Sequence, residues 1–194
     1  MRRRGFTLAE ALMALVILTL VGGGILAIYA AGIRLFNRTS TFSQAAAAAN
    51  TAAKGMASDG QEAMALKYAT SLPAGERSSS TQLVLALPAK NGTTGYNLVP
   101  LQEGTWLRYY LSDKTGVYGN TGTSLWRGKK SVSEGVWRPE KRLADSVSAL
   151  EFEYQPSLEK ATLVAINVVT TARRGGKTVE GSATTEVLLR NVKE

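Results

Sequence analysis

The chemistry nearest the N-terminus depends on one carboxylate. Glu10 stands between the basic cluster Arg2–Arg4 and an uncharged apolar stretch from Ala11 to Ile33. An ionised carboxylate costs on the order of 3 kcal/mol at mid-membrane and less near the interface, so a positive partner is expected. Cleavage between Gly5 and Phe6 would create an α-amino group four residues before Glu10. Glu10 could then pair with its own N-terminus or with that of a neighbouring molecule, and the second arrangement would set the register of an assembly.

A second group of charged side chains lies in the stretch from Trp126 to Arg142. It contains six cations against Glu134 and Glu140, with Trp126 and Trp137 interleaved. Cations that meet phosphates, beside aromatic rings that stack on bases, are what single-stranded DNA binding requires. The alternative is a pair of cationic loops whose tryptophans lie in the core. The candidate DNA-binding residues are Arg127, Lys129, Lys130, Arg138, Lys141 and Arg142.

The composition excludes most familiar catalytic and metal chemistry. The 194 residues include no cysteine and no histidine, which excludes thiolate or imidazole zinc sites, disulfides, and Ser-His-Asp or Cys-His catalysis. The glycine-rich loop Asp113–Asn120 lacks the ligand density of a calcium site. Glu151 and Glu153 alternate with apolar residues and are expected to face solvent. The sequence therefore predicts no catalytic residue, no metal ligand and no cofactor.

The apolar stretch that follows Glu10 is long enough to cross a membrane. Its 23 residues from Ala11 to Ile33 would form a helix roughly 35 Å long. Arg2–Arg4 precede it, which predicts that the N-terminus stays in the cytoplasm and that the residues after Ile33 lie outside. A secretory signal peptide cleaved after Gly32 would fit the same hydropathy, but such a signal has no use for Glu10.

Three consecutive glycines, Gly22, Gly23 and Gly24, interrupt this helix near its middle. Each glycine costs about 1 kcal/mol relative to alanine in a helix interior. The run therefore marks either a weak point at which the helix can unwind or a place where another backbone packs closely.

The N-terminal residues also resemble a known family. Arg4-Gly5-Phe6-Thr7-Leu8-Ala9-Glu10, followed at once by the apolar run, resembles the prepilin leader of type IV pilins and type II secretion pseudopilins. The resemblance implies cleavage after Gly5 by the prepilin peptidase and N-methylation of the new Phe6 amine. It also implies that Glu10 pairs with the N-terminus of a neighbouring subunit, and that in the assembled filament the helix melts near the three glycines. The implied partners are other pilin or pseudopilin subunits, an inner-membrane assembly platform and membrane lipid.

The rest of the chain is expected to form an α+β domain, with the long N-terminal helix packed on an antiparallel β-sheet. We expect a leader at 1–5, a transmembrane and polymerisation helix at 6–36, a helical continuation at 37–72 and a β-rich globular domain at 73–194. Within the continuation, the first helix is expected to end near Ala57, with a second short helix after Ser58-Asp59-Gly60. The turn of a hairpin is expected at Arg173–Lys177. The predicted strands are Gln82–Leu87, Thr105–Leu111, Ser124–Arg127, Ser146–Tyr154, Thr162–Thr170 and Thr184–Arg190.

Residues 100–192 show a looser resemblance to the W-type minor pilins and J-type pseudopilins. It rests on Trp106–Leu111, Leu125-Trp126-Arg127, the segment Val147 to Tyr154 and a last strand that closes in Leu189-Arg190-Asn191. The chain lacks the disulfide-closed loop of many major pilins, so the resemblance implies a minor subunit.

Three functions follow from these observations. The first is a structural and assembly subunit of a type IV pilus or type II secretion filament, inserted in the inner membrane with its C-terminal domain outside. The second is a DNA-binding minor pilin of a competence pilus; the net charge of +8, which includes Arg2–Arg4, adds only a mild indication of an anionic partner. The third is an exported or membrane-anchored enzyme with an unrecognised carboxylate site.

Overall fold

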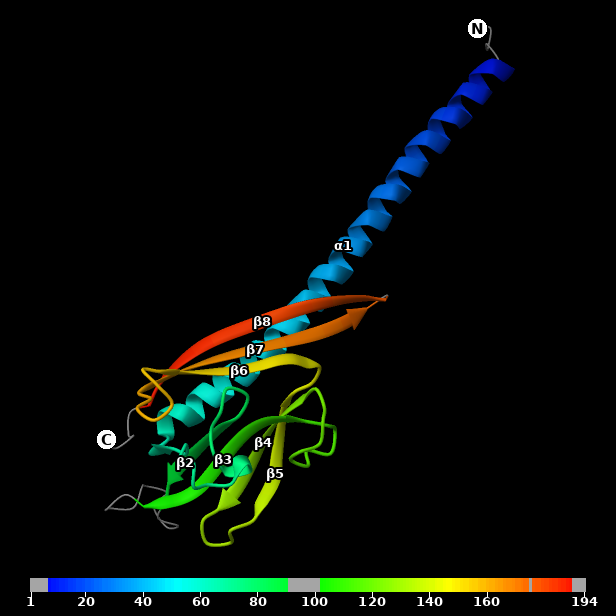
Figure 1. Cartoon of the computed structure of the whole chain (residues 1–194). Helices are drawn as coiled ribbons and strands as arrows, with labels where there is room; N and C mark the ends of the chain where they lie inside the picture. Colours follow the sequence, from blue (N-terminus) through cyan, green and yellow to red (C-terminus); the bar gives the residue numbers. More distant parts are fainter. Residues whose placement is uncertain (1–6, 91–101, 175, 190–194) are drawn as a thin grey trace. The chain divides into compact units, whose positions relative to one another are not determined.

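The computed structural model describes residues 7–90, 102–174 and 176–189. The chain divides into two compact units, Met1–Ser40 and Thr41–Glu194. One helix, α1 (Leu8–Glu62), supplies all the described secondary structure of the first unit and continues into the second. In the second unit the helix packs on antiparallel β-sheets (Figure 1), which confirms the predicted α+β fold.

The strands of the second unit form two antiparallel sheets. In the first sheet the spatial order is β1–β2–β3–β4–β5, and in the second it is β6–β7–β8. A short 3-10 helix, η1 (Ala74–Glu76), lies between β1 and β2 in the chain. The strands are β1 (Ala65–Leu66), β2 (Leu83–Pro88), β3 (Glu103–Ser112), β4 (Ser124–Ser131), β5 (Trp137–Ala144), β6 (Val147–Gln155), β7 (Leu163–Arg174) and β8 (Lys177–Leu188).

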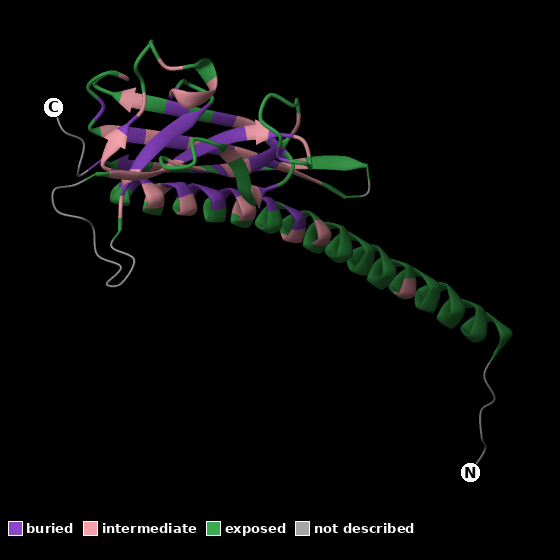
Figure 2. Ribbon diagram, turned by 90° about the horizontal axis from the view of Figure 1, so that it is seen from below, coloured by how far each residue is buried: buried purple, intermediate pink, exposed green. Residues whose placement is uncertain are grey.

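The part of α1 in the second unit buries a stripe of mostly small residues against the sheets (Figure 2). Small side chains allow the strands to approach the helix backbone closely. A Cβ atom added at Gly181 of β8 would lie only 2.6 Å from the carbonyl carbon of Ala45. The Thr170 hydroxyl of β7 donates a hydrogen bond of 2.7 Å to the Ala45 carbonyl. The buried stripe consists of Thr41, Ala45, Ala49, Ala52, Ala53, Met56 and Gly60.

The prediction that the helix ends near Ala57 and that a second short helix follows Gly60 is wrong. The helix α1 continues to Glu62, and the next element is β1, which pairs with β2 through Ala65 and Ala86. The helical continuation therefore does not reach residue 72. Gly60 does not stop the helix, because it lies in the buried stripe, where an added Cβ would meet Val187 Cγ1 at 2.8 Å. This glycine is needed for close packing.

All six predicted strands have a counterpart among the described residues, although several bounds differ, and Arg190, the predicted end of the last strand, lies outside those residues. The hairpin at Arg173–Lys177 is confirmed, since Arg174 of β7 pairs with Lys177 of β8. The last strand begins at Lys177, seven residues before the predicted start, and β5 was not predicted as a strand. The β5 sequence is mostly charged and exposed and contains Pro139, a composition typical of a sheet edge, where β5 lies.

Candidate assembly site

The start of α1 contains a capping box made by Thr7 and Glu10. The Thr7 backbone N–H and the Thr7 hydroxyl each donate a 2.9 Å hydrogen bond to Glu10 Oε2, and the Glu10 N–H donates one of 3.3 Å to Thr7 Oγ1. This reciprocal pattern is the usual stabilising device at a helix N-terminus. The spacing Thr7-x-x-Glu10 could have predicted it from the sequence. Gly5 and Phe6, at the predicted cleavage site, lie outside the described residues.

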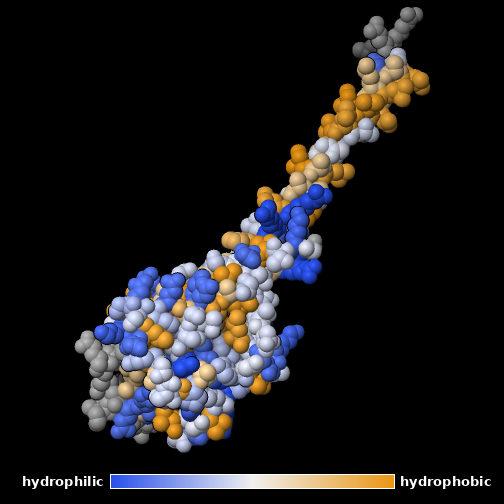
Figure 3. All heavy atoms as spheres, viewed as in Figure 1, coloured by the Kyte–Doolittle hydropathy of each residue, from blue (hydrophilic) through white to orange (hydrophobic). Residues whose placement is uncertain are grey.

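The first unit presents an apolar surface that its described residues, from Thr7 to Ser40, leave uncovered. Its large hydrophobic side chains from Leu8 to Phe36 are exposed, with Leu8 at 82 % and Ile28 at 75 %. Figure 3 shows the apolar colour gathered along this part of α1. The segment is long and apolar enough to cross a membrane. A continuous apolar surface of this kind requires lipid or the helices of other subunits around it.

The three glycines lie inside the continuous helix. At Gly22, Gly23 and Gly24 an added Cβ atom would meet nothing within 4 Å, and all three residues are helical. The described residues of this chain therefore supply no packing reason for glycine at these positions. Both interpretations of the run, a weak point or a contact with another backbone, remain predictions about the assembled state.

The candidate DNA-binding residues lie on a β-hairpin and not on a pair of loops. β4 and β5 pair through Arg127 and Lys141, and through Lys129 and Arg138. Most of the cations on this hairpin make ion pairs with carboxylates of the second unit. The pairs are Arg127 with Asp59 and Glu140 (both 2.8 Å), Lys129 with Glu140 (4.0 Å), Lys130 with Glu76 (2.6 Å), Arg138 with Glu134 (3.3 Å) and Arg142 with Asp145 (3.3 Å). Among the described residues, only Lys141 of the six makes no such pair.

The two tryptophans of the hairpin are half-buried, and their polar atoms are occupied. The indole N–H of Trp126 donates to the Asp113 carbonyl at 2.8 Å, and that of Trp137 donates to Glu76 at 3.2 Å. The guanidinium of Arg108 lies 4.4 Å from the centre of the Trp137 ring. Base stacking needs a free ring face and phosphate binding needs free cations, so these contacts give DNA binding no support. The DNA-binding hypothesis stays a prediction.

Arg108 and Glu76 form a polar cluster that the sequence analysis missed. Arg108 is only 5 % exposed, lies 3.8 Å from the Tyr118 ring centre and donates a 2.8 Å hydrogen bond to the Gly75 carbonyl. Burial lowers the pKa of Arg108. The hydrogen bond from Lys130 holds the pKa of Glu76 below its usual range. Because η1 supplies Glu76 and the strands supply the cations, only the tertiary fold brings these residues together.

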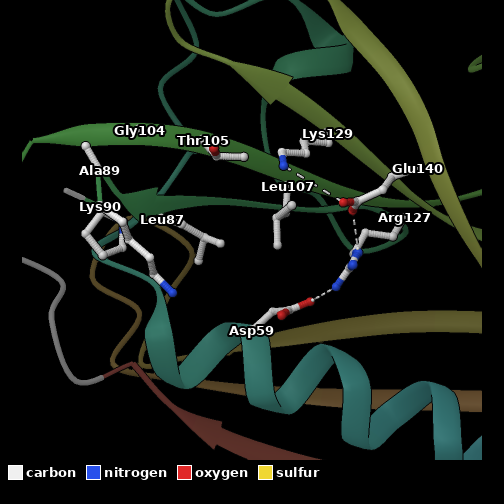
Figure 4. Close-up of a pocket in the computed structure, with 11 residues that line it drawn as sticks. Asp59, Leu87, Ala89, Lys90, Gly104, Thr105, Leu107, Arg127, Lys129 and Glu140 are labelled. Carbon is white, nitrogen blue, oxygen red and sulfur yellow. Dashed lines mark hydrogen bonds and ion pairs between the residues drawn. The ribbon is translucent and has the colours of Figure 1, made fainter. Parts of the chain in front are cut away.

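A groove of about 460 Å³ lies between the end of α1 and the first sheet (Figure 4). Asp59 of α1 accepts hydrogen bonds from Arg127 at 2.8 Å and from the Tyr109 hydroxyl. Burial raises the pKa of Tyr109 well above its usual value, and the negative charge of Asp59 adds to this. Glu140 pairs with Arg127 from the other side. Arg127 of β4 lies between these two carboxylates, so its bond to Asp59 joins the helix to the sheet.

These features define a class of protein: a subunit with an N-terminal apolar helix that needs a membrane or partner helices, and an α+β domain with its own core. Residues 1–26 match the family model of the prokaryotic N-terminal methylation motif. This motif is the signature of type IV pilins and pseudopilins, so the chain carries the signature of that family and has its architecture of a long helix on antiparallel sheets. No curated protein and no solved structure matches the chain. The motif implies assembly with other pilin subunits and processing by prepilin peptidase, and the apolar helix fits a single-pass inner-membrane precursor.

Proposed function

We propose that this protein is a minor pilin or pseudopilin, a structural subunit that enters a type IV pilus or type II secretion filament through its N-terminal helix. The prepilin peptidase cleaves after Gly5, and the new Phe6 amine is methylated. The precursor spans the inner membrane once, with the second unit outside. The observation that carries the proposal is the exposed apolar part of α1, which begins with one carboxylate, in a chain whose second unit has a complete core without it.

In this proposal Glu10 sets the register between subunits. The capping box uses only one of the two carboxylate oxygens, since both bonds from Thr7 reach Oε2. No described residue donates a hydrogen bond to Oε1. A carboxylate has about four acceptor positions, so the positively charged Phe6 amine of a neighbouring subunit can bind while the cap stays intact. In hydrocarbon surroundings an unpaired carboxylate is costly, which favours the register that supplies the amine.

The glycine run has a second role in the proposal. Gly22–Gly24 lower the helical stability of the span by about 1 kcal/mol per residue relative to alanine. We favour a weak point that unwinds when the subunit passes from lipid into the filament. Close approach of a neighbouring helix would use the same glycines.

The resemblance to W-type minor pilins and J-type pseudopilins supports a position near the tip of the filament, where the subunit primes assembly with other minor subunits. This assignment rests on the sequence of residues 100–192.

The test uses Glu10→Ala in the full chain, expressed in its native host in place of the wild-type protein. The variant should be cleaved normally but recovered poorly with the major subunit after crosslinking and pull-down. Glu62→Gln is the matched control, because Glu62 is an exposed carboxylate on the same helix whose only described ion pair, with Lys90 at 3.5 Å, is also exposed. Recovery of Glu10→Ala at the level of this control would refute the register argument.

A further inference from the structure

The tip of the β7–β8 hairpin carries three cations that form no ion pair with any described residue. Arg173, Arg174 and Lys177 are exposed and close together, since Arg174 pairs with Lys177 and Arg173 with Thr178 across the turn. We call these three residues the basic tip. No carboxylate among the described residues lies within ion-pair distance of them. The nearest acidic residue in the hairpin sequence is Glu180. On the β4–β5 hairpin, by contrast, five of six cations are paired within the unit.

The contacts of β8 with α1 place the basic tip at one end of the second unit. Gly60 lies against Val187 and Leu189, whereas Gly181 lies against Ala45. β8 therefore runs in the same direction as the helix (Figure 1), and its first residues lie toward the helix residues that come earlier in the chain. Four strand positions separate Gly181 from Lys177, which puts the basic tip roughly 13 Å farther from Gly60 than Gly181 is. The chain enters the second unit at this same end, at Thr41.

We propose that the basic tip binds anionic phospholipid headgroups at the outer surface of the membrane while the subunit awaits assembly. The inference rests on the proposed single-pass insertion, because the apolar span brings the entry end of the second unit to the membrane. Only seven residues join Ile33, at the end of the span, to Thr41. Two further cations, Arg34 and Arg38, lie within these residues and are exposed. Basic side chains near an anionic membrane surface are attracted over about a Debye length, roughly 10 Å at 0.1 M salt.

This contact gives the unpaired cations a partner of the right charge and restrains the second unit at the membrane. Because the attraction is electrostatic and superficial, it weakens with salt and does not oppose extraction of the subunit into a filament. An anionic lipid is favoured over a nucleic acid because the hairpin residues 171–181 include no aromatic side chain on which bases could stack.

The experiment measures how close the basic tip lies to lipid headgroups. The full chain contains no cysteine, so Thr178→Cys gives a single attachment point for a fluorophore beside the basic tip, and Ser157→Cys gives one in the loop at the opposite end of the β6–β8 sheet. Each labelled protein is reconstituted into vesicles of phosphatidylcholine alone or with phosphatidylglycerol, both containing a lipid with a nitroxide on its headgroup. Flotation of the vesicles verifies that the chain has inserted.

The tip variant replaces Arg173, Arg174 and Lys177 by glutamine. The matched control removes three exposed cations that make no described ion pair elsewhere in the unit, as Lys114→Gln, Lys141→Gln and Lys160→Gln. Both variants change the net charge equally and touch no buried residue. Each cation near the surface is worth on the order of a fivefold change in the equilibrium, so the tip variant should bind on the order of a hundredfold more weakly.

The proposal predicts quenching at Thr178→Cys in the vesicles with phosphatidylglycerol, for the unsubstituted chain and for the control variant. Quenching should be lost in high salt, in phosphatidylcholine alone and in the tip variant, and it should be absent at Ser157→Cys. Equal quenching in both membranes, or equal quenching of the tip variant, would overturn the proposal. A fluorescence change with single-stranded DNA and no quenching by the anionic vesicles would overturn it in favour of a nucleic-acid site. Flotation without quenching refutes the tip contact alone, whereas failure to float refutes the insertion on which it rests.

Discussion

The contact between β8 and α1 makes Gly181→Ala a demanding test of the packing. The new Cβ would lie 2.6 Å from the carbonyl carbon of Ala45 and 2.8 Å from Cα of Ala46. Both atoms belong to the helix backbone, which cannot turn away as a side chain can. The neighbouring bond from the Thr170 hydroxyl to the Ala45 carbonyl, 2.7 Å long, also ties β7 to the same helical turn. The substitution therefore has to push the helix and the sheet apart.

Overpacking of this kind costs about 1–3 kcal/mol, and a rigid backbone contact favours the upper part of that range. At about 2–4 °C per kcal/mol for a domain of this size, the melting temperature should fall by about 4–12 °C. Gly55→Ala is the matched control, because Gly55 lies in the same helix and an added Cβ meets nothing within 4 Å. That change should stabilise the chain by about 0.5–1 kcal/mol.

The assay is thermal unfolding of the full chain in detergent, followed by tryptophan fluorescence. All three tryptophans, Trp106, Trp126 and Trp137, lie in the second unit and report on its packing. The two alanine variants should shift the transition in opposite directions. A melting temperature of Gly181→Ala equal to or above that of the unsubstituted chain would refute the close approach of β8 to α1.

Two further substitutions test the polar contacts of the second unit. Asp59→Asn removes the charge that binds Arg127, and it should destabilise the chain by about 1–3 kcal/mol in urea unfolding. The control Glu62→Gln, in an exposed ion pair, should change the free energy of unfolding by less than about 1 kcal/mol. Equal effects of the two substitutions would contradict the role of Asp59. Glu76 has a lowered pKa in the folded chain, so its contribution to stability is present above the ordinary glutamate pKa and is lost as the pH falls through the lowered value. The stability difference between the unsubstituted chain and Glu76→Gln should thus be largest at neutral pH and vanish in acid, and a difference that does not change with pH would contradict the bond from Lys130.

The sequence predicted the elements whose residues act locally. The run from Ala11 to Ile33 shows its continuous apolar character directly, and the strand Ser146–Tyr154 shows its alternation; both lie in elements of the expected type. The sequence-based prediction failed where tertiary contacts determine where an element ends. Aspartate is a common helix N-cap and glycine often ends a helix. In the structure, however, Asp59 binds Arg127 and Gly60 fits against Val187, so the helix continues. From the sequence alone, such positions cannot be distinguished from a true helix end, because the sheet that packs on them determines their role.

The candidate site residues also divide into those whose role the sequence could predict and those whose contacts depend on the fold. The carboxylate of Glu10 could be singled out because its chemistry conflicts with the apolar residues around it, and its cap is visible in the spacing from Thr7. The cations of the β4–β5 hairpin could be counted, but their partners Asp59 and Glu76 lie far away in the sequence. Counting charges therefore overstated how many cations are available to a ligand.

The central claim is that the chain is processed as a pilin and keeps its apolar helix. Intact-mass spectrometry of the protein from its native membrane, with sequencing of the N-terminal peptide, tests this most directly. The account predicts a chain that begins at Phe6 and carries one added methyl group. A chain that begins at Ile33, or one that retains Met1, would contradict it.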